Sequence, residues 1–358
     1  MLRQASGSEA GLKLNARQAV VLRAMVSAYV GEASPIGSAT LSHLLPVNLS
    51  SASIRTTLAE LTRLGLAEQP HPSAGRIPTE RGLRFFIDEL LDPTHLGAYE
   101  RRAIASSVDA AEVDSVMQVA SQLLSERTHQ LGFVVTPRID RIVLQHVSLV
   151  RLTTDRVLVV LVSQAGETHR RLVDEASDSD QAELDRIAAM LNERVVGRTL
   201  PEVRAVLARE ARLLQRRADR LLARAIDLGA RALACEDGEA VDLVIETRLA
   251  LLDQPEFRDP RRLRDVLAAV ETKERLLEVI DRMLGEEEEG VSVAFGEEVD
   301  EPSLRCCALV ATHYGRRESD EQGPLGVLGV IGPSRMDYGR VISLVEYLSQ
   351  VMTERLSA

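Results

Sequence analysis

The chain has 358 residues, of which 45% are hydrophobic and 27% are charged, a composition that excludes a disordered polypeptide and a length that exceeds one ordinary core. Its net charge of −11 is uneven: residues 1–95 carry nine cationic and eight anionic side chains, and the remainder carries 34 against 46, or −12. Because an acidic body repels a polyanion, any contact with nucleic acid must be local to the near-neutral residues 1–95.

The first part of the chain predicts three helices in succession. The first begins after Asn15, which has Gln18 at the spacing of a capping box. A short second helix is expected over residues 39–45, and a third is expected to begin at Ser50 or Ser51.

The third helix has one apolar and one polar face. Ile54, Leu58 and Leu61 recur at helical spacing and predict a stripe that faces a core. The opposite side carries small and polar residues, namely Ala52, Thr56, Ala59 and Arg63, flanked by Ser53 and Arg55. Small residues let a backbone approach the major groove, while hydroxyl and guanidinium groups reach base edges or phosphates. This pattern favours a recognition helix.

The stretch PHPSAGRIPT, residues 70–79, lies between a predicted strand at 66–69 and a predicted helix at 79–91. Its small residues narrow the loop, and we expect Arg76 at the tip, where it would meet the negative potential of a groove. Three helices followed by a strand, a loop and a strand predict a winged helix-turn-helix. Two alternatives stay open: the unit can be a plain interaction module, and Arg55 can be a structural ion-pair partner of Glu60 or a neighbouring acid.

Beyond residue 96 the pattern becomes mixed. A helix is expected to close at Gly132, and residues 142–152 and 156–163 read as a hairpin. A predominantly helical block follows at about 178–235. The remaining expectations are a strand at 242–252, helices within 260–284, strands at 291–295, 305–313 and 325–331, and a final helix at 337–356. Strands at both ends of the helical block predict that the block is inserted into one α+β domain.

No catalytic or metal-binding pattern is found. The histidines never fall at metal-ligand spacing, and neither a GxSxG elbow nor a GxGxxG loop is present. The acidic run 286–289 reads as a solvated loop, and the glycines of 323–333 read as a closely packed strand. The arginine-rich stretch 201–233 can be a second nucleic-acid surface or a solvated, dimer-facing helix. We favour the latter, because 41 of the 43 cationic residues are arginine.

The same sequence indicates a reducing compartment away from membranes. Cys235, Cys306 and Cys307 form no CxxC motif, and adjacent cysteines rarely bridge, so we expect a cytoplasmic protein. The longest aliphatic run, Val157–Val162, is too short to cross a bilayer. Residues 1–11 lack the apolar segment of a signal peptide, so we expect no export.

Nearly the whole chain resembles the HrcA family of bacterial heat-inducible transcription repressors. The most specific segments are LSSASIRTTLAEL (49–61), PHPSAGRIPTERGLRFFIDEL (70–90) and LGVIGPSRMDYGRVISLVEYLSQVMTERL (328–356). This chain has Thr56 where the family usually has asparagine. It also has Gly82-Leu83-Arg84-Phe85-Phe86-Ile87-Asp88 where the family usually has the tyrosine-rich GYRxYVD.

The resemblance implies an α+β multidomain fold in three parts. Residues 1–95 would form a winged helix-turn-helix DNA-binding domain. A GAF-like α+β domain would occupy residues 96–165 and 256–358. A mainly helical dimerisation domain would be inserted within it at residues 166–255.

The resemblance also implies a function without catalysis, cofactor or metal. Members repress chaperone operons by binding double-stranded DNA at an inverted repeat called CIRCE, and they depend on the chaperonin GroEL to stay active. A homodimer matches the two-fold symmetry of such an operator. We assign the DNA contacts to Ser51, Ser53, Arg55, Thr56, Arg63 and Arg76.

Two other classes of function compete with this interpretation. The first is a small-molecule-gated transcriptional regulator that uses the GAF-like domain as its sensor. The second is an enzyme with a helical N-terminal appendage, which would need a nucleophile, a base or a metal cluster that the sequence does not offer.

Overall fold

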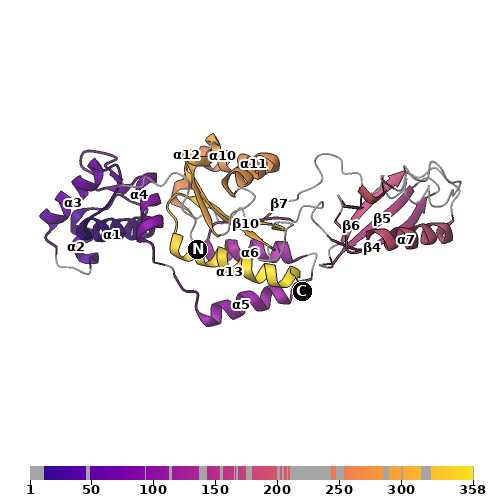
Figure 1. Ribbon diagram of the computed structural model, residues 1–358. Helices are drawn as coiled ribbons and strands as arrows, with labels where there is room; N and C mark the ends of the chain where they lie inside the picture. The colour runs from indigo at the N-terminus through magenta and orange to yellow at the C-terminus, as the bar shows by residue number, and fades with distance from the viewer. Residues whose placement is uncertain are drawn as a thin grey trace.

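The computed structural model arranges the chain as three units in a row (Figure 1). We call residues 12–92 the N-terminal unit, residues 94–136 with 243–357 the central unit, and residues 143–207 the distal unit. The structure describes residues 12–45, 49–92, 94–112, 115–136, 143–153, 156–164, 166, 168–174, 180–199, 202–203, 205–207, 209, 243–246, 254–284, 290–299, 301–315 and 324–357. The expected helix at 201–233, the acidic run at 286–289 and Cys235 lie wholly or mostly outside these residues.

The N-terminal unit contains the three expected helices and a small two-stranded sheet. Its elements are α1 (Ala16–Glu32), α2 (Ser38–Leu44), α3 (Ser51–Arg63), β1 (Ala67–Glu68), β2 (Ile77–Pro78), α4 (Glu80–Phe85) and the π-helical turn η1 (Phe86–Leu90). The capping box before α1 is confirmed: the backbone amide of Gln18 donates to the side chain of Asn15 over 2.9 Å, and the reverse bond is 3.0 Å. Strands β1 and β2 are antiparallel, with Ala67 opposite Pro78.

A shared apolar core holds these elements together. Ile54, Leu58 and Leu61 of α3 are buried as their spacing predicts, with Leu22 and Met25 of α1. Burial of each such side chain is worth about 1.5–3 kcal/mol, so this stripe orients α3 and fixes which of its faces remains outside.

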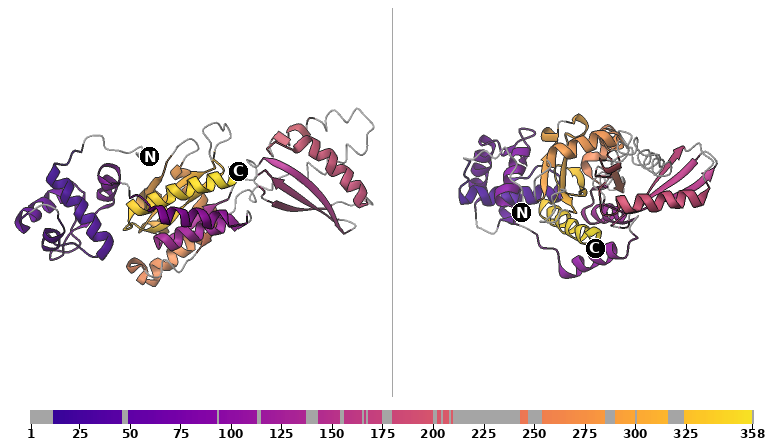
Figure 2. Two further views of the ribbon diagram at one scale, coloured as in Figure 1. Left: turned by 90° about the horizontal axis from the view of Figure 1, so that it is seen from below. Right: turned by 45° about the vertical axis from the view of Figure 1, so that its right-hand side comes forward.

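The central unit is built on a five-stranded antiparallel sheet in the order β7-β3-β10-β9-β8. Its strands are β3 (Leu131–Val135), β7 (Leu243–Glu246), β8 (Ser292–Phe295), β9 (Cys307–Tyr314) and β10 (Gly326–Pro333). Helices α6 (Val116–Thr128) and α13 (Tyr338–Ser357) cover one face, and α10 (Pro260–Glu271) and α11 (Lys273–Leu284) cover the other (Figures 1 and 2). Helix α5 (Ala98–Asp109) packs on the outer side of α6 and α13. Short turns complete it: η5 (Pro255–Arg258), α12 (Gly296–Val299) and η6 (Pro302–Leu304).

The burial pattern follows from this three-layer arrangement. All eight residues of β10 are buried, because helices cover both faces of the strand. In β9, Ala308 and Val310 belong to the core under α6 and α13, whereas Leu309 and Ala311 belong to the core under α10 and α11. The three strands and the final helix expected near the C-terminal end are confirmed within a few residues.

One expected boundary in this unit is wrong. The helix expected to close at Gly132 instead ends at Thr128, and His129 takes a left-handed conformation with φ of 55°. Gly132 lies inside β3, where an added Cβ would overlap the carbonyl of Ser121 on α6. Glycine is therefore required by close packing of strand against helix, not by a helix end.

The distal unit has its own sheet and its own core. Strands β4 (Leu144–Thr153), β5 (Arg156–Ser163) and β6 (Thr168–Asp174) form an antiparallel sheet, and α7 (Gln181–Val195) packs on one face. Two side-chain amides of helix α7 form hydrogen bonds with the backbone of the edge strand β4. Asn192 bonds the backbone amide and carbonyl of Val147 at 2.7 and 2.8 Å, and Gln181 bonds Arg151 N and Leu149 O at 3.0 and 2.8 Å.

The pairing of strands differs from the domain boundaries expected at residues 166 and 256. The boundary at residue 166 falls between β5 and β6, which pair from Arg156 opposite Asp174 to Val162 opposite Thr168. The hairpin expected in the GAF-like part therefore belongs to the distal sheet. At the other end, β7 pairs with β3, so residues 243–246 belong to the central sheet although its resumption is expected only at residue 256.

Candidate nucleic-acid interface

The outer face of α3 is exposed to solvent because of how the helix begins and how it packs. Ser50 caps it by accepting a 3.2 Å hydrogen bond from the backbone amide of Ser53. With the apolar stripe turned inward, Ser51, Arg55, Thr56 and Arg63 are exposed, and Ser53 is half-buried. Four of the five residues predicted on this helix therefore reach solvent along one side.

The hydroxyl groups at the start of α3 are oriented by neighbours. Ser51 Oγ lies 3.1 Å from Ser38 Oγ at the start of α2, which links the two helices. Thr56 Oγ1 donates to the carbonyl of Ala52 over 3.1 Å, so its lone pairs remain as acceptors on the exposed side. These short groups leave room for a groove wall to approach the helix.

Arg55 is not the partner of Glu60. Glu60 instead faces α1, where Arg17 lies 3.5 Å away and Gln18 donates a 3.0 Å hydrogen bond to its carboxylate. Among the residues that the structure describes, Arg55 makes no ion pair or hydrogen bond, although its side chain is exposed. Its guanidinium is thus available to an external acceptor.

Arg76 does not lie at the loop tip, and this expectation is wrong. Its side chain is half-buried, and its Nε donates to Thr62 Oγ1 over 3.1 Å. Its backbone pairs in both directions with Ile36 at 2.9 Å, which ties the base of the loop to the segment before α2. An added Cβ on Gly75 would overlap the carbonyl of Ile36, so the small residues of the loop serve this close contact.

The exposed part of the loop is residues 69–73. The side-chain amide of Gln69 donates to the carbonyls of Pro72 and Ala74, both at 2.9 Å, and the amide of Ala74 donates to the carbonyl of His71 at 2.9 Å. These bonds and the flanking prolines hold His71 and Ser73 outward on a stiff tip. His71 and Ser73 are not among the contact residues predicted from the sequence. The rigid PHPS run marks their position, but the charge of Arg76 favoured that residue as the groove contact instead.

Chemistry elsewhere in the described residues is limited. No group of three or more histidine, cysteine or acidic side chains there could hold a metal ion. The thiols of Cys306 and Cys307 lie 4.0 Å apart. The hydrogen bond from Cys307, with help from the charge of Arg262, lowers the pKa of Cys306 to about 7, while the same bond and burial raise the pKa of Cys307.

No helix in the described part of the chain is long and apolar enough to cross a membrane. The arrangement so far is that of a multidomain α+β regulator: a terminal unit with an exposed polar helix face, a larger central unit and a distal unit.

Comparison with known proteins names the family. The model of the HrcA protein C-terminal domain matches residues 114–342. The heat-inducible transcription repressor HrcA of Syntrophobacter fumaroxidans is 36% identical over 345 residues, covering 96% of this chain and 97% of the relative. HrcA of Geobacter sulfurreducens is 33% identical over 345 residues, covering 96% and 98%. The chain therefore belongs to the HrcA family of heat-inducible transcription repressors, which are regulators and not enzymes.

One solved structure shares the fold. It is titled as a hypothetical protein at 2.2 Å resolution, and it aligns with 96% of this chain and 99% of its own length, with a TM-score of 0.61 and 22% identity. The mixed α+β architecture of the described residues is thus a known arrangement.

Proposed function

We propose that this protein represses chaperone genes in the cytoplasm by binding the CIRCE inverted repeat as a homodimer. The N-terminal unit would act as a winged helix-turn-helix, with α3 in the major groove and the loop 69–73 as the wing. The observation that carries this proposal is the exposed face of α3, on which Ser51, Arg55 and Thr56 project together from the near-neutral part of an otherwise acidic chain.

Each predicted residue has a distinct role in this proposal. Arg55 would read a guanine edge or clamp a phosphate, since its fork-shaped donors suit both acceptors. Ser51 and Thr56 would offer hydroxyls to base edges, and Arg63 would meet a phosphate at the far end of the helix. Ser53 is half-buried and would act mainly through the helix start.

Arg76 would act indirectly. Because it bonds Thr62 and pairs with Ile36, it would hold the loop in place so that His71 and Ser73 reach the backbone of the duplex. This role differs from the groove contact that its position in the sequence suggested.

We propose that the second copy docks on the uncovered face of the distal sheet. Val150, Leu158 and Leu172 stand side by side across the three strands in one row of that face. The exposed fractions of Val150 and Leu152 on β4 and of Leu172 on β6 are 39%, 53% and 56%, which is high for large apolar residues of one sheet. The distal unit lies at the opposite end of the molecule from α3, so dimerisation there would leave both recognition helices free (Figure 1).

The central unit would be the GAF-like domain, and GroEL would act on the fraction of repressor that is correctly assembled. Apolar core clusters of described residues pack against both faces of the central sheet, which supports a structural role for this unit over that of a small-molecule sensor. A chaperonin that refolds loosened chains would raise the number of DNA-competent dimers and leave the affinity of each dimer unchanged.

The test is a titration of the protein with excess fluorescent inverted repeat, with and without GroEL. The proposal expects a higher active fraction with GroEL at a constant Kd, and no shift of a scrambled duplex. A tighter Kd at a constant active fraction would instead make GroEL a direct allosteric partner. Failure to prefer the inverted repeat would remove the proposed function.

A further inference from the structure

The N-terminal unit is fixed to the central unit by a buried arginine that comes from the central unit. Arg335 lies between β10 and α13, and its side chain is only 10% exposed. Its Nε and one terminal nitrogen donate to the carboxylate of Glu256 at 2.6 and 3.2 Å, and the same terminal nitrogen lies 3.1 Å from Gln254 Oε1. Its other terminal nitrogen donates to the carbonyl of Val30, in the last turn of α1.

This contact suits the chemistry at a helix end. The last carbonyls of a helix have no partner within the helix and carry partial negative charge, so a cation is favourable there. Glu256 neutralises the guanidinium that burial would otherwise penalise. Burial raises the pKa of Tyr29, which precedes Val30 in the same turn of α1, and the charge of Glu256 raises it further. Arg335 is thus fully engaged, with its donors divided between the two units.

A second arginine makes the reciprocal contact from the N-terminal unit. Arg84 of α4 has a side chain that is 18% exposed and forms an ion pair with Glu298 of α12. It also donates to the carbonyl of Val293 on β8 over 2.7 Å, and its guanidinium lies 5.0 Å from the ring centroid of Phe295. Phe295 in turn packs edge-on against Tyr338, with ring centroids 5.8 Å apart.

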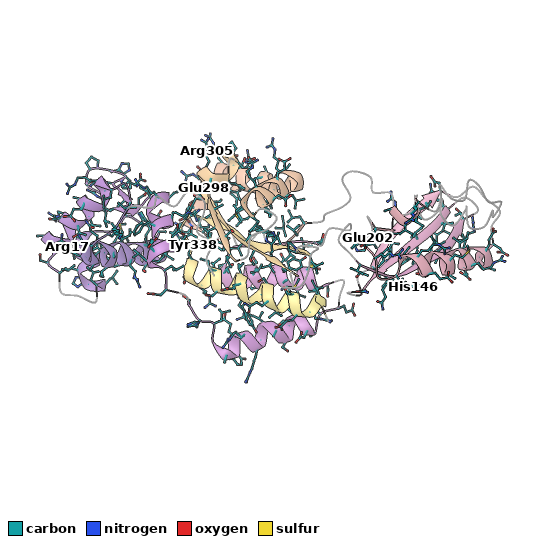
Figure 3. The ribbon with its side chains drawn as sticks, in the orientation of Figure 1. Arg17, His146, Glu202, Glu298, Arg305 and Tyr338 are labelled. Carbon is teal, nitrogen blue, oxygen red and sulfur yellow. The ribbon has the colours of Figure 1, made fainter. Side chains whose placement is uncertain are left out.

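These groups lie on the side of the central unit that faces the N-terminal unit, as Glu298 and Tyr338 show in Figure 3. Apolar contacts accompany them, because one continuous core cluster includes side chains of both units. In Figure 1, α3 lies at the end of the N-terminal unit that is remote from this joint, so a small rotation at the joint displaces α3 more than any nearer element.

We infer that Arg84 and Arg335 are positioning residues for operator recognition: they lock the N-terminal unit onto the central unit so that the two α3 helices of a dimer meet both half-sites at once. This inference rests on the proposed function. Two tethered contacts can exceed a single contact in affinity by about 10²–10⁴-fold, but only while the geometry permits both. A loosened joint therefore removes the second contact and leaves the first intact.

The test compares two duplexes, one with the full inverted repeat and one with a single half-site, on full-length Arg84→Met and Arg335→Met proteins. Methionine keeps much of the stem and removes the charge and the donors. We expect the full-site Kd to weaken by at least about 10-fold and the half-site Kd to stay within about two-fold of wild type. Arg335→Lys keeps the charge but cannot reach three acceptors at once, so its full-site Kd should lie between the Kd of wild type and that of Arg335→Met.

The matched control is Arg340→Met. Arg340 also forms an ion pair, with Glu100 at 2.8 Å, but both residues belong to the central unit. A donor–acceptor dye pair on non-canonical amino acids at the exposed positions Ser27 and Gln122 reports the separation of the two units. Arg335→Met should broaden that distance distribution, and Arg340→Met should leave it unchanged.

Other outcomes would contradict the inference or the proposed function. An equal loss of affinity for the two duplexes would mean that the arginines act on the N-terminal unit itself. Unchanged affinity for both duplexes would show that the joint does not position α3. Either result overturns the inference. If wild type fails to prefer the inverted repeat over a scrambled duplex, the proposed function fails first. An unchanged distance distribution in Arg335→Met would then overturn the joint as well.

Discussion

At the scale of single residues, burial distinguishes two arginines to which the sequence pattern gives the same role as groove contacts. Arg55 lies on the polar face of the predicted recognition helix and Arg76 lies in the predicted loop, and the sequence pattern assigns both to the groove. The structure exposes Arg55 and places Arg76 against Thr62 and Ile36. The difference could not be predicted, because it depends on a loop that folds back onto a segment about 40 residues earlier in the chain.

The two arginines should therefore respond differently to truncation. We expect Arg55→Ala to weaken binding of the inverted repeat by about 10–100-fold, with a free energy of unfolding within about 0.5 kcal/mol of wild type. Arg76→Ala removes a half-buried hydrogen bond to Thr62 and should lower the free energy of unfolding by about 1 kcal/mol. Fluorescence anisotropy and urea unfolding measure the two effects. An Arg55→Ala protein that binds as wild type does would remove Arg55 from the interface.

The thiol of Cys306 should have an unusual pH profile. Its pKa is lowered to about 7 by the hydrogen bond from Cys307, so the reactive thiolate is scarce below that pH and predominates above it. We expect the alkylation rate of Cys306 to rise through a midpoint near pH 7, while Cys307 stays protected by burial. Peptide mapping after timed alkylation identifies each site. In Cys307→Ala the midpoint should move to higher pH, and an unmoved midpoint would refute the stated cause.

At the scale of elements, periodicity predicts those elements that have an apolar face of their own. The helices of the N-terminal unit, the hairpin of β4 and β5, and the three C-terminal strands all show such a face, and all are confirmed. Strand β6 has only Val173 buried, so nothing in its sequence marks it; it exists because β5 offers an edge to pair with. The pattern likewise failed at β3, where Gly132 resembles a helix end.

Gly132 provides a test of that last point. We expect Gly132→Ala to lower the free energy of unfolding by about 1–3 kcal/mol, because the new methyl group must displace the carbonyl of Ser121. Gly97→Ala is the matched control, since an added Cβ there meets no atom within 4 Å. Urea unfolding of both variants gives the comparison. Equal stability of the two would show that β3 does not pack on α6 as closely as described.

At the scale of the whole molecule, the central unit joins the N-terminal unit, which we propose binds DNA, to the distal sheet with its exposed apolar face. Sheet pairing, and not sequence pattern, shows that β4 to β6 form a separate body. Much of the helical block expected in the dimerisation domain lies outside the described residues, whereas Val150, Leu152 and Leu172 on the distal sheet could be recognised only once their shared face was known.

Replacing one of these residues should separate the copies. We expect Leu172→Asp to shift the protein from dimer to monomer at micromolar concentration, because a carboxylate on that face would be buried without a partner. The exposed position leaves the monomer itself stable. Sedimentation velocity measures the change, and Glu193→Lys on the exposed side of α7 serves as a control for surface charge. A persistent Leu172→Asp dimer would move the interface elsewhere.

The central claim, that a dimer presents two α3 helices to two half-sites, is tested most directly by hydroxyl-radical footprinting of the inverted repeat. We expect two protected tracts related by the two-fold axis of the repeat, with both tracts weakened by Arg55→Ala. In Leu172→Asp each monomer can occupy either of the two equivalent half-sites, so both tracts should weaken equally and their protection should require a higher protein concentration. A single tract for the wild-type protein, or protection that ignores the repeat and spreads along the duplex, would contradict it.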